Sequence, residues 1–102
     1  MMDYLKNYNI NDEQIRNLEK VIRSESSNID LFMFEPEIIT NILDLFTSIG
    51  VTNIYGIIMT CPSMFCDTIE SIKKRIDKYE DKTELARLLN DDPSNLILIG
   101  IA

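Results

Sequence analysis

The chain has 102 residues and a formal net charge of −7, with 10 Lys and Arg against 17 Asp and Glu, which disfavours electrostatic capture of nucleic acid or of an anionic membrane. It contains no histidine, no tryptophan and only three glycines, so a histidine-based triad, a histidine zinc site and a glycine-rich phosphate loop are excluded. The proportions of hydrophobic residues (45%) and charged residues (26%) are those of an ordinary folded protein, and we expect one domain over residues 1–102.

The first predicted helix begins after Asn11, a residue type that caps helix N-termini, and ends near Ser24. Its apolar residues recur at helical spacing: Ile15, Leu18, Val21 and Ile22. Residues 26–28 predict a turn. Residues 30–34 form an apolar connector that is too short to assign.

The clearest periodic segment starts at Pro36, because proline suits the first position of a helix, and Gly50 stands where a left-handed residue would end it. Thr52 is then expected to cap a short helix that ends at Cys61, since the residue before a proline avoids the helical conformation. The helix after Pro36 has a broad apolar face: Ile38, Ile39, Ile42, Leu43, Leu45, Phe46 and Ile49.

The last third of the chain predicts two more helices and an apolar tail. Asp67 followed by Glu70 resembles a capping box. Thr83 is expected to cap the last helix, which ends before Pro93. The helix after Asp67 has one apolar face: Ile69, Ile72, Ile76 and Tyr79. Residues 96–101 look locally strand-like, but the sequence offers no second strand, and we predict an all-α fold.

An internal repeat relates the middle of the chain to its end at an offset of 31 residues, which aligns Pro62 with Pro93. Other positions align at the same offset: Leu45 with Ile76, Thr52 with Thr83, Ile54 with Leu85, Ile57 with Leu88 and Ile58 with Leu89. Each unit comprises a longer helix, a capped turn, a short helix and a Pro-Ser-x-apolar turn. The prediction is therefore a short solenoid-like stack of helical hairpins.

This division gives a divergent first unit (residues 1–35), two clear units (36–66 and 67–98) and a tail (99–102). Residues 26–29 could fill the turn of the first unit, although they do not keep the 31-residue offset.

The period and the proline placement resemble the helical repeat of the mitochondrial transcription termination factor (mTERF) family. The resemblance covers about residues 37–98 and is carried by Leu45, Gly50, Ile54, Ile57, Ile58, Pro62, Ile76, Leu85, Leu88, Leu89 and Pro93. It implies pairs of helices followed by a 3₁₀ turn, stacked in a right-handed superhelix, and binding of nucleic acid in a basic concave groove. This chain departs from the family in being shorter and acidic.

The basic residues of the better repeats are confined to the last third, because residues 36–68 contain no lysine or arginine. The candidate nucleic-acid contacts are Lys73, Lys74, Arg75, Lys78 and Lys82. A helix with Ile72 and Ile76 inward would turn Lys74, Arg75 and Lys78 outward. The favoured alternative is a solvated face in which Glu70 pairs with Lys74 one turn later.

No catalytic, metal-binding or cofactor-binding residue is predicted, and we expect no enzyme activity and no cofactor. Cys61 and Cys66 are too few for a metal site without histidine and are expected to be buried and reduced. Six residues are expected to pack in the core rather than to form a binding groove: Met33, Met59, Met64, Phe32, Phe34 and Phe65. No leader or membrane span is expected, which predicts a cytoplasmic protein.

The function predicted from these observations is a non-catalytic helical-repeat module that binds another macromolecule, above all a protein. The alternative is an mTERF-like, nucleic-acid-associated regulator of transcription or translation. The apolar tail is the candidate interface, through Leu96, Ile97, Leu98, Ile99 and Ile101. It either folds back onto the last helix or joins a second copy, and we favour a homodimer.

Overall fold

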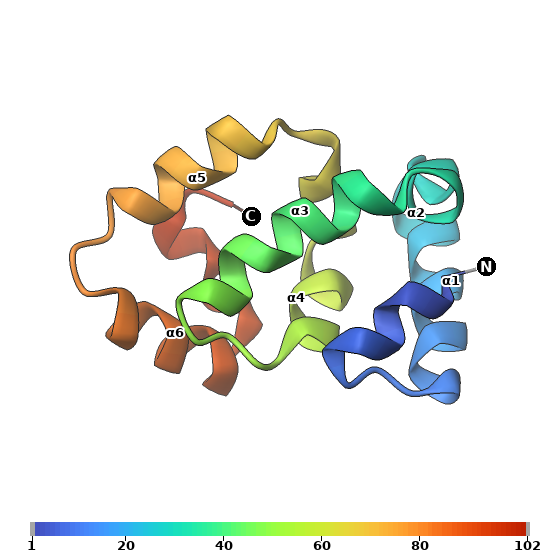
Figure 1. Ribbon diagram of the computed structural model, residues 1–102, viewed down its shortest axis with the longest axis horizontal. Coiled ribbons are helices and arrows are strands. Elements are labelled where there is room, and N and C mark those ends of the chain that lie inside the picture. Colours follow the sequence, from blue (N-terminus) through green and yellow to red (C-terminus); the bar gives the residue numbers. More distant parts are fainter. Residues whose placement is uncertain (1, 102) are drawn as a thin grey trace.

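The computed structural model describes residues 2–101, and every regular element in that range is a helix (Figure 1). Helices hold 77% of the described residues, which include no strand, so the all-α prediction is confirmed. Elements marked η are 3₁₀ helices, and the order is η1 (Asp3–Tyr8), α1 (Asp12–Glu25), α2 (Ile29–Phe34), α3 (Pro36–Ser48), α4 (Ile54–Thr60), η2 (Pro62–Cys66), α5 (Ile69–Asp77), α6 (Lys82–Asp91) and η3 (Pro93–Ile99).

The predicted ends of α1 and α3 are confirmed. At α1, the side-chain oxygen of Asn11 accepts the backbone N–H of Gln14 at 2.8 Å, and the Gln14 side chain accepts the N–H of Asn11 at 3.0 Å, which makes a full capping box. Helix α3 starts at Pro36, and Gly50 follows its end with φ of +109°. That left-handed backbone is the conformation expected of a glycine after a helix.

Two helices begin at a cap one or two residues away from the predicted one. Helix α4 is capped by Asn53 rather than Thr52, and helix α6 by Asp81 rather than Thr83. Asn and Asp are at least as favourable as Thr at this position, because their side-chain oxygens readily reach the N–H three residues on. Thr83 consequently lies inside the first turn of α6.

The predicted capping box at Asp67 is also wrong in its residues. Thr68 is the cap of α5, and its hydroxyl accepts the N–H of Ser71 at 3.1 Å. Asp67 supports this cap from outside the helix, because its carboxylate accepts the Thr68 N–H at 2.8 Å and the Ser71 hydroxyl at 3.0 Å. Glu70 takes no part in the cap.

Two segments that the sequence left without a helix are helical. Residues 30–34 lie in the short helix α2, and the strand-like tail forms η3. A 3₁₀ helix repeats every three residues, which places Leu96 and Ile99 on one side, where both are buried. Ile97 and Leu98 are left on the opposite side, exposed to solvent.

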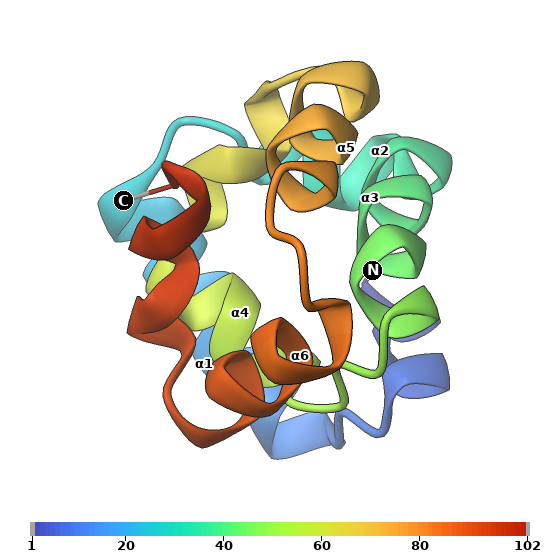
Figure 2. The same ribbon diagram turned by 90° about the vertical axis from the view of Figure 1, so that its left-hand side faces the viewer.

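Helix α4 lies near the middle of the molecule and contacts α1, η2 and η3 (Figure 2). Helix α3 contacts α2, η2 and α5. The core between these elements includes the α4 residues Ile54, Ile57 and Ile58 and an edge-to-face pair, Phe32 and Phe65, with ring centroids 5.1 Å apart. The molecule measures 36 × 24 × 21 Å.

Two residues expected in the core are at the surface. Phe34 is 74% exposed, because α2 ends there and the chain turns into α3 before the ring can reach the core. Cys66 is exposed at the end of η2, whereas Cys61 is buried as expected.

Within residues 2–101, no helix combines the length and the apolar character that crossing a bilayer requires.

Candidate interaction surfaces

Lys74 and Arg75 of α5, with Lys78 directly after it, line a depression of about 400 Å³. Its lining comprises Thr68, Glu70, Ser71, Lys74, Arg75 and Lys78. The structure thus brings together three of the five predicted phosphate contacts. The expected Glu70–Lys74 ion pair is not formed, and neither Lys74 nor Lys78 makes an ion pair with another described residue. These two ammonium groups are therefore available to a ligand.

The other two predicted contacts, Lys73 and Lys82, are engaged elsewhere. The Lys73 ammonium pairs with the Asp77 carboxylate at 2.9 Å. The Lys82 ammonium donates to the backbone carbonyls of Asp77, at 3.1 Å, and Tyr79, where α5 ends. A cation at that end of a helix is favoured by the helix dipole. Lys73 and Lys82 thus stabilise α5 and the turn that follows it.

Arg75 lines the depression but also serves the fold. Its guanidinium donates to the Gly100 carbonyl at 3.0 Å and so links α5 to the residue that follows η3. A phosphate that recruited Arg75 would compete with this contact.

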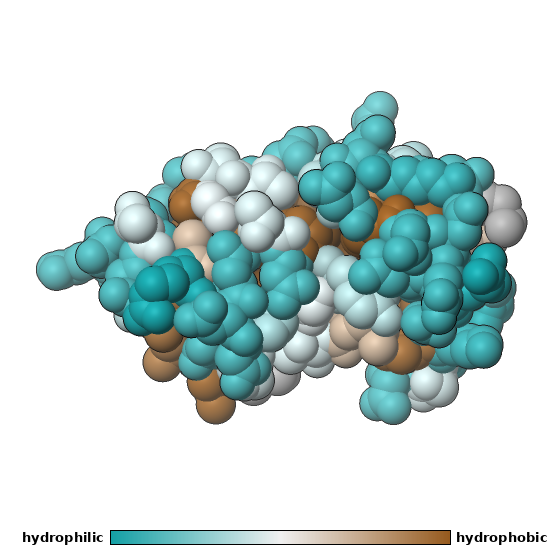
Figure 3. All heavy atoms as spheres, turned by 90° about the horizontal axis from the view of Figure 1, so that it is seen from below, coloured by the Kyte–Doolittle hydropathy of each residue, from teal (hydrophilic) through white to brown (hydrophobic). Residues whose placement is uncertain are grey.

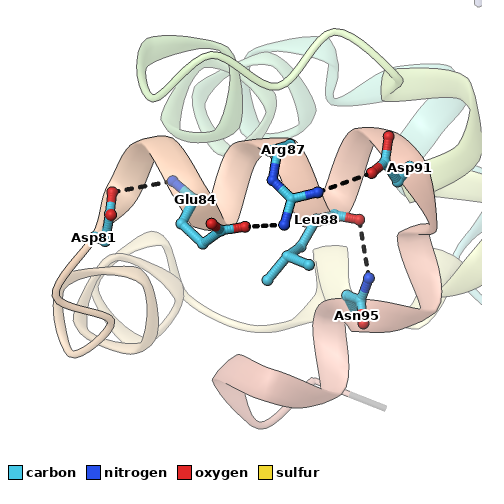
Figure 4. Close-up of polar contacts among 6 residues, drawn as sticks. All are labelled: Asp81, Glu84, Arg87, Leu88, Asp91 and Asn95. Atoms are coloured by element: carbon cyan, nitrogen blue, oxygen red, sulfur yellow. Dashed lines mark hydrogen bonds and ion pairs between the residues drawn. The ribbon is translucent and has the colours of Figure 1, made fainter.

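Arg87, the remaining basic residue of the last third, is enclosed by acids on α6 (Figure 4). Its guanidinium pairs with the carboxylates of Glu84 and, at 3.2 Å, Asp91. Figure 4 also shows Asn95 donating to the Leu88 carbonyl at 2.9 Å, which ties η3 to α6. The charge of Arg87 is thus more than balanced by the two acids on this face of α6.

A groove of about 280 Å³ lies between α3 and the start of α5. Its lining is Ile38, Asn41, Ile42, Asp67, Thr68, Ile69 and Glu70. Ile38 is 43% exposed. Phe34 stands four residues before Ile38, at the junction of α2 and α3. We name Phe34 and Ile38 the α2–α3 apolar pair.

A second exposed apolar pair, Ile97 and Leu98 on η3, is 65% and 49% exposed. Seen from below, apolar side chains protrude at the end of the molecule that α6 and η3 form (Figure 3). Leu98 also borders a depression of about 290 Å³ with Arg75, Lys78 and Tyr79. The other predicted interface residues, Leu96, Ile99 and Ile101, are buried against the chain itself.

The sequence interpretation missed the α2–α3 apolar pair. The available signal was the width of the α3 apolar face, since six apolar residues on thirteen positions exceed what one neighbouring layer covers. Of these, Ile39, Ile42, Leu43 and Phe46 are buried. Ile38 lies at the margin of that buried stripe and remains at the surface.

The described residues 2–101 contain no group of three Cys, Asp or Glu side chains placed to hold a metal ion. Comparison with models of protein families, with curated proteins and with solved structures gives no match to this chain.

Proposed function

We propose that the protein is a non-catalytic interaction module whose partner is another protein. One observation carries the proposal: large apolar side chains are exposed at two separate places, Phe34 with Ile38 and Ile97 with Leu98, on a domain that buries most of its other aliphatic residues. Contiguous exposed apolar patches that are rimmed by polar residues mark protein interaction sites. Binding would bury them and so provide the main favourable free energy.

The repeat interpretation remains part of this proposal. Supporting it, two α-helices followed by a 3₁₀ helix that begins with proline occur twice, as α3–α4–η2 and α5–α6–η3. The contacts between neighbouring units also repeat: α1 contacts η2 of the next unit, and α4 contacts η3 of the unit after that. In this scheme η1, α1 and α2 form the first unit, and Phe65 and Leu96 are equivalent buried residues of the other two units. Such units fit the proposed kinship with mTERF repeats.

A second copy of the chain is a natural partner for Ile97 and Leu98. Light scattering should then give twice the chain's mass of 11.8 kDa, and Ile97→Asp should return the monomer. A monomeric wild-type protein at high concentration would reject this assembly.

The second candidate function is the nucleic-acid-associated regulator. The depression with Lys74, Arg75 and Lys78 favours it, because two of its cations carry no ion pair to a described residue. Against it stands the net charge of −7.

Titration with labelled RNA and duplex DNA discriminates the two candidates. We expect no saturable binding at physiological salt. Binding that weakens steeply with salt, and disappears in Lys74→Glu with Lys78→Glu, would replace the first candidate by the second.

A further inference from the structure

The groove between α3 and α5 is large enough to accept one or two side chains of a partner. Ile42, 1% exposed, forms its base, Ile38 borders it from α3, and Ile69 borders it from α5. Its volume of about 280 Å³ is just below that of pockets that enclose whole small molecules, which begin at about 300 Å³. An anchoring side chain of a protein segment fits this volume.

The lining of the groove contains acidic side chains and no basic ones. Residues 24–72 contain no lysine or arginine and seven Asp and Glu, and every residue that lines the groove lies in this span. Asp67 and Glu70 stand in the lining itself. Neither carboxylate makes an ion pair with another described residue. A cationic segment would therefore form ion pairs with these two carboxylates without displacing an existing ion-pair partner.

Asp67 is held in position before any partner arrives. Its two oxygens accept from the Thr68 N–H and the Ser71 hydroxyl, and a carboxylate with one bond to each oxygen retains acceptor capacity. On α5, Lys73 is paired with Asp77, and Lys74 follows Glu70 by one turn without pairing with it. Glu70 also lines the basic depression, whereas Asp67 borders only the groove of these two.

We infer that this groove binds a short segment of a partner protein in which an aliphatic or aromatic side chain is flanked by lysine or arginine. The apolar side chain would enter between Ile38, Ile42 and Ile69, and the flanking cations would meet Asp67 and Glu70. Asn41 in the lining offers an amide to the segment's backbone. This inference rests on the proposed function and names its partner's chemistry.

The test uses a labelled synthetic peptide with a leucine pair flanked on both sides by arginine pairs, and a matched peptide with glutamate in place of arginine. The full chain should bind the arginine peptide and not the glutamate peptide. Amide resonances of Asn41, Thr68 and Glu70 should shift on binding. Ile38→Asp should weaken binding by about tenfold or more. Glu70→Gln should weaken it by a smaller factor, and this effect should disappear at high salt concentration.

Matched controls are Ile97→Asp, at the other exposed apolar pair, and Glu80→Gln, an exposed acid outside the groove; both should bind as the wild type does. Ile38 is already partly exposed, so a circular dichroism melt should show that its variant folds. Absent binding, equal binding of the two peptides, or insensitivity to Ile38→Asp would overturn the inference. Loss of the peptide in Ile97→Asp alone would overturn it and leave the proposed function standing, whereas a chain that captures nucleic acid and no protein would remove the proposed function itself.

Discussion

The side chain of Asn90 in α6 binds the backbone at the start of α4, where Asn53 is the cap. Its amide oxygen accepts the N–H of Thr52 at 2.8 Å and of Asn53 at 3.1 Å. Its amide nitrogen donates to the Gly50 carbonyl at 3.2 Å. One side chain thus satisfies three backbone groups in the loop between α3 and α4, and it joins the middle of the chain to its last helix.

Replacing this side chain should destabilise the protein. Asn90→Ala is expected to lower the free energy of unfolding by about 1–3 kcal/mol, because three backbone groups lose their partner in a half-buried site. Urea denaturation measures the change. Asn41→Ala, an exposed asparagine, should stay within about 0.5 kcal/mol of the wild type. Equal effects of the two variants would show that the Asn90 bridge contributes nothing.

Gly50 is required for its backbone conformation rather than for space. With φ of +109°, a β-branched residue is strained there, although a Cβ would meet only the Ala86 Cβ at 3.5 Å. Gly50→Val should therefore cost about 1–2 kcal/mol of unfolding free energy. An unchanged melting temperature would contradict a left-handed residue at this position.

The two sides of η3 should respond differently to truncation. Leu96→Ala removes a side chain that is 1% exposed and should cost about 2–5 kcal/mol. Ile97→Ala removes one that is 65% exposed and should change the stability of the monomer by about 0.5 kcal/mol or less. If both substitutions had similar effects on chemical denaturation at low protein concentration, η3 would not be packed as described.

Alkaline pH should weaken the fold through Tyr4. Burial, with a smaller contribution from Tyr8, raises the pKa of Tyr4 above its ordinary value of about 10. The folded state therefore favours the neutral phenol, which donates to the Phe32 carbonyl at 2.7 Å. This contribution to stability is complete below pH 10 or so and is lost as the pH rises beyond it.

The variant Tyr4→Phe isolates this effect. At pH 8 it should be less stable than the wild type by about 1 kcal/mol, the worth of one hydrogen bond. Melting curves recorded at increasing pH should show that the stability difference between the two proteins shrinks above pH 10. A constant difference across the whole range would mean that Tyr4 does not titrate with unfolding.

Local sequence signals predicted the helices well where one residue type determines the outcome. Asn11, Pro36 and Gly50 each define a helix end by their own chemistry, and each does so in the structure. The caps of α4 and α6 were misplaced because several capping residues stand side by side there, and the tertiary contacts of the loop select among them.

Long-range packing could not be read from the sequence. Gly56 lies inside α4, where glycine is unfavourable, and its reason is distant: a Cβ would lie 2.6 Å from the Pro93 Cγ of η3. Likewise, the exposure of Phe34 and Ile38 depends on which helices cover α3. Lys74, Arg75 and Lys78 line one depression, whereas Lys73 pairs with Asp77 one turn later and Lys82 binds the carbonyls at the end of α5, contacts that the sequence interpretation did not include.

The most direct measurement of the proposed function is affinity capture on the purified chain from a nuclease-treated lysate, with bound proteins identified for the wild type and three variants. Defined proteins should bind the wild type and Lys74→Glu with Lys78→Glu equally, and should be lost from Ile38→Asp or from Ile97→Asp. Capture that needs intact nucleic acid, or that disappears with Lys74 and Lys78 while both isoleucine variants retain it, would contradict a protein-binding module.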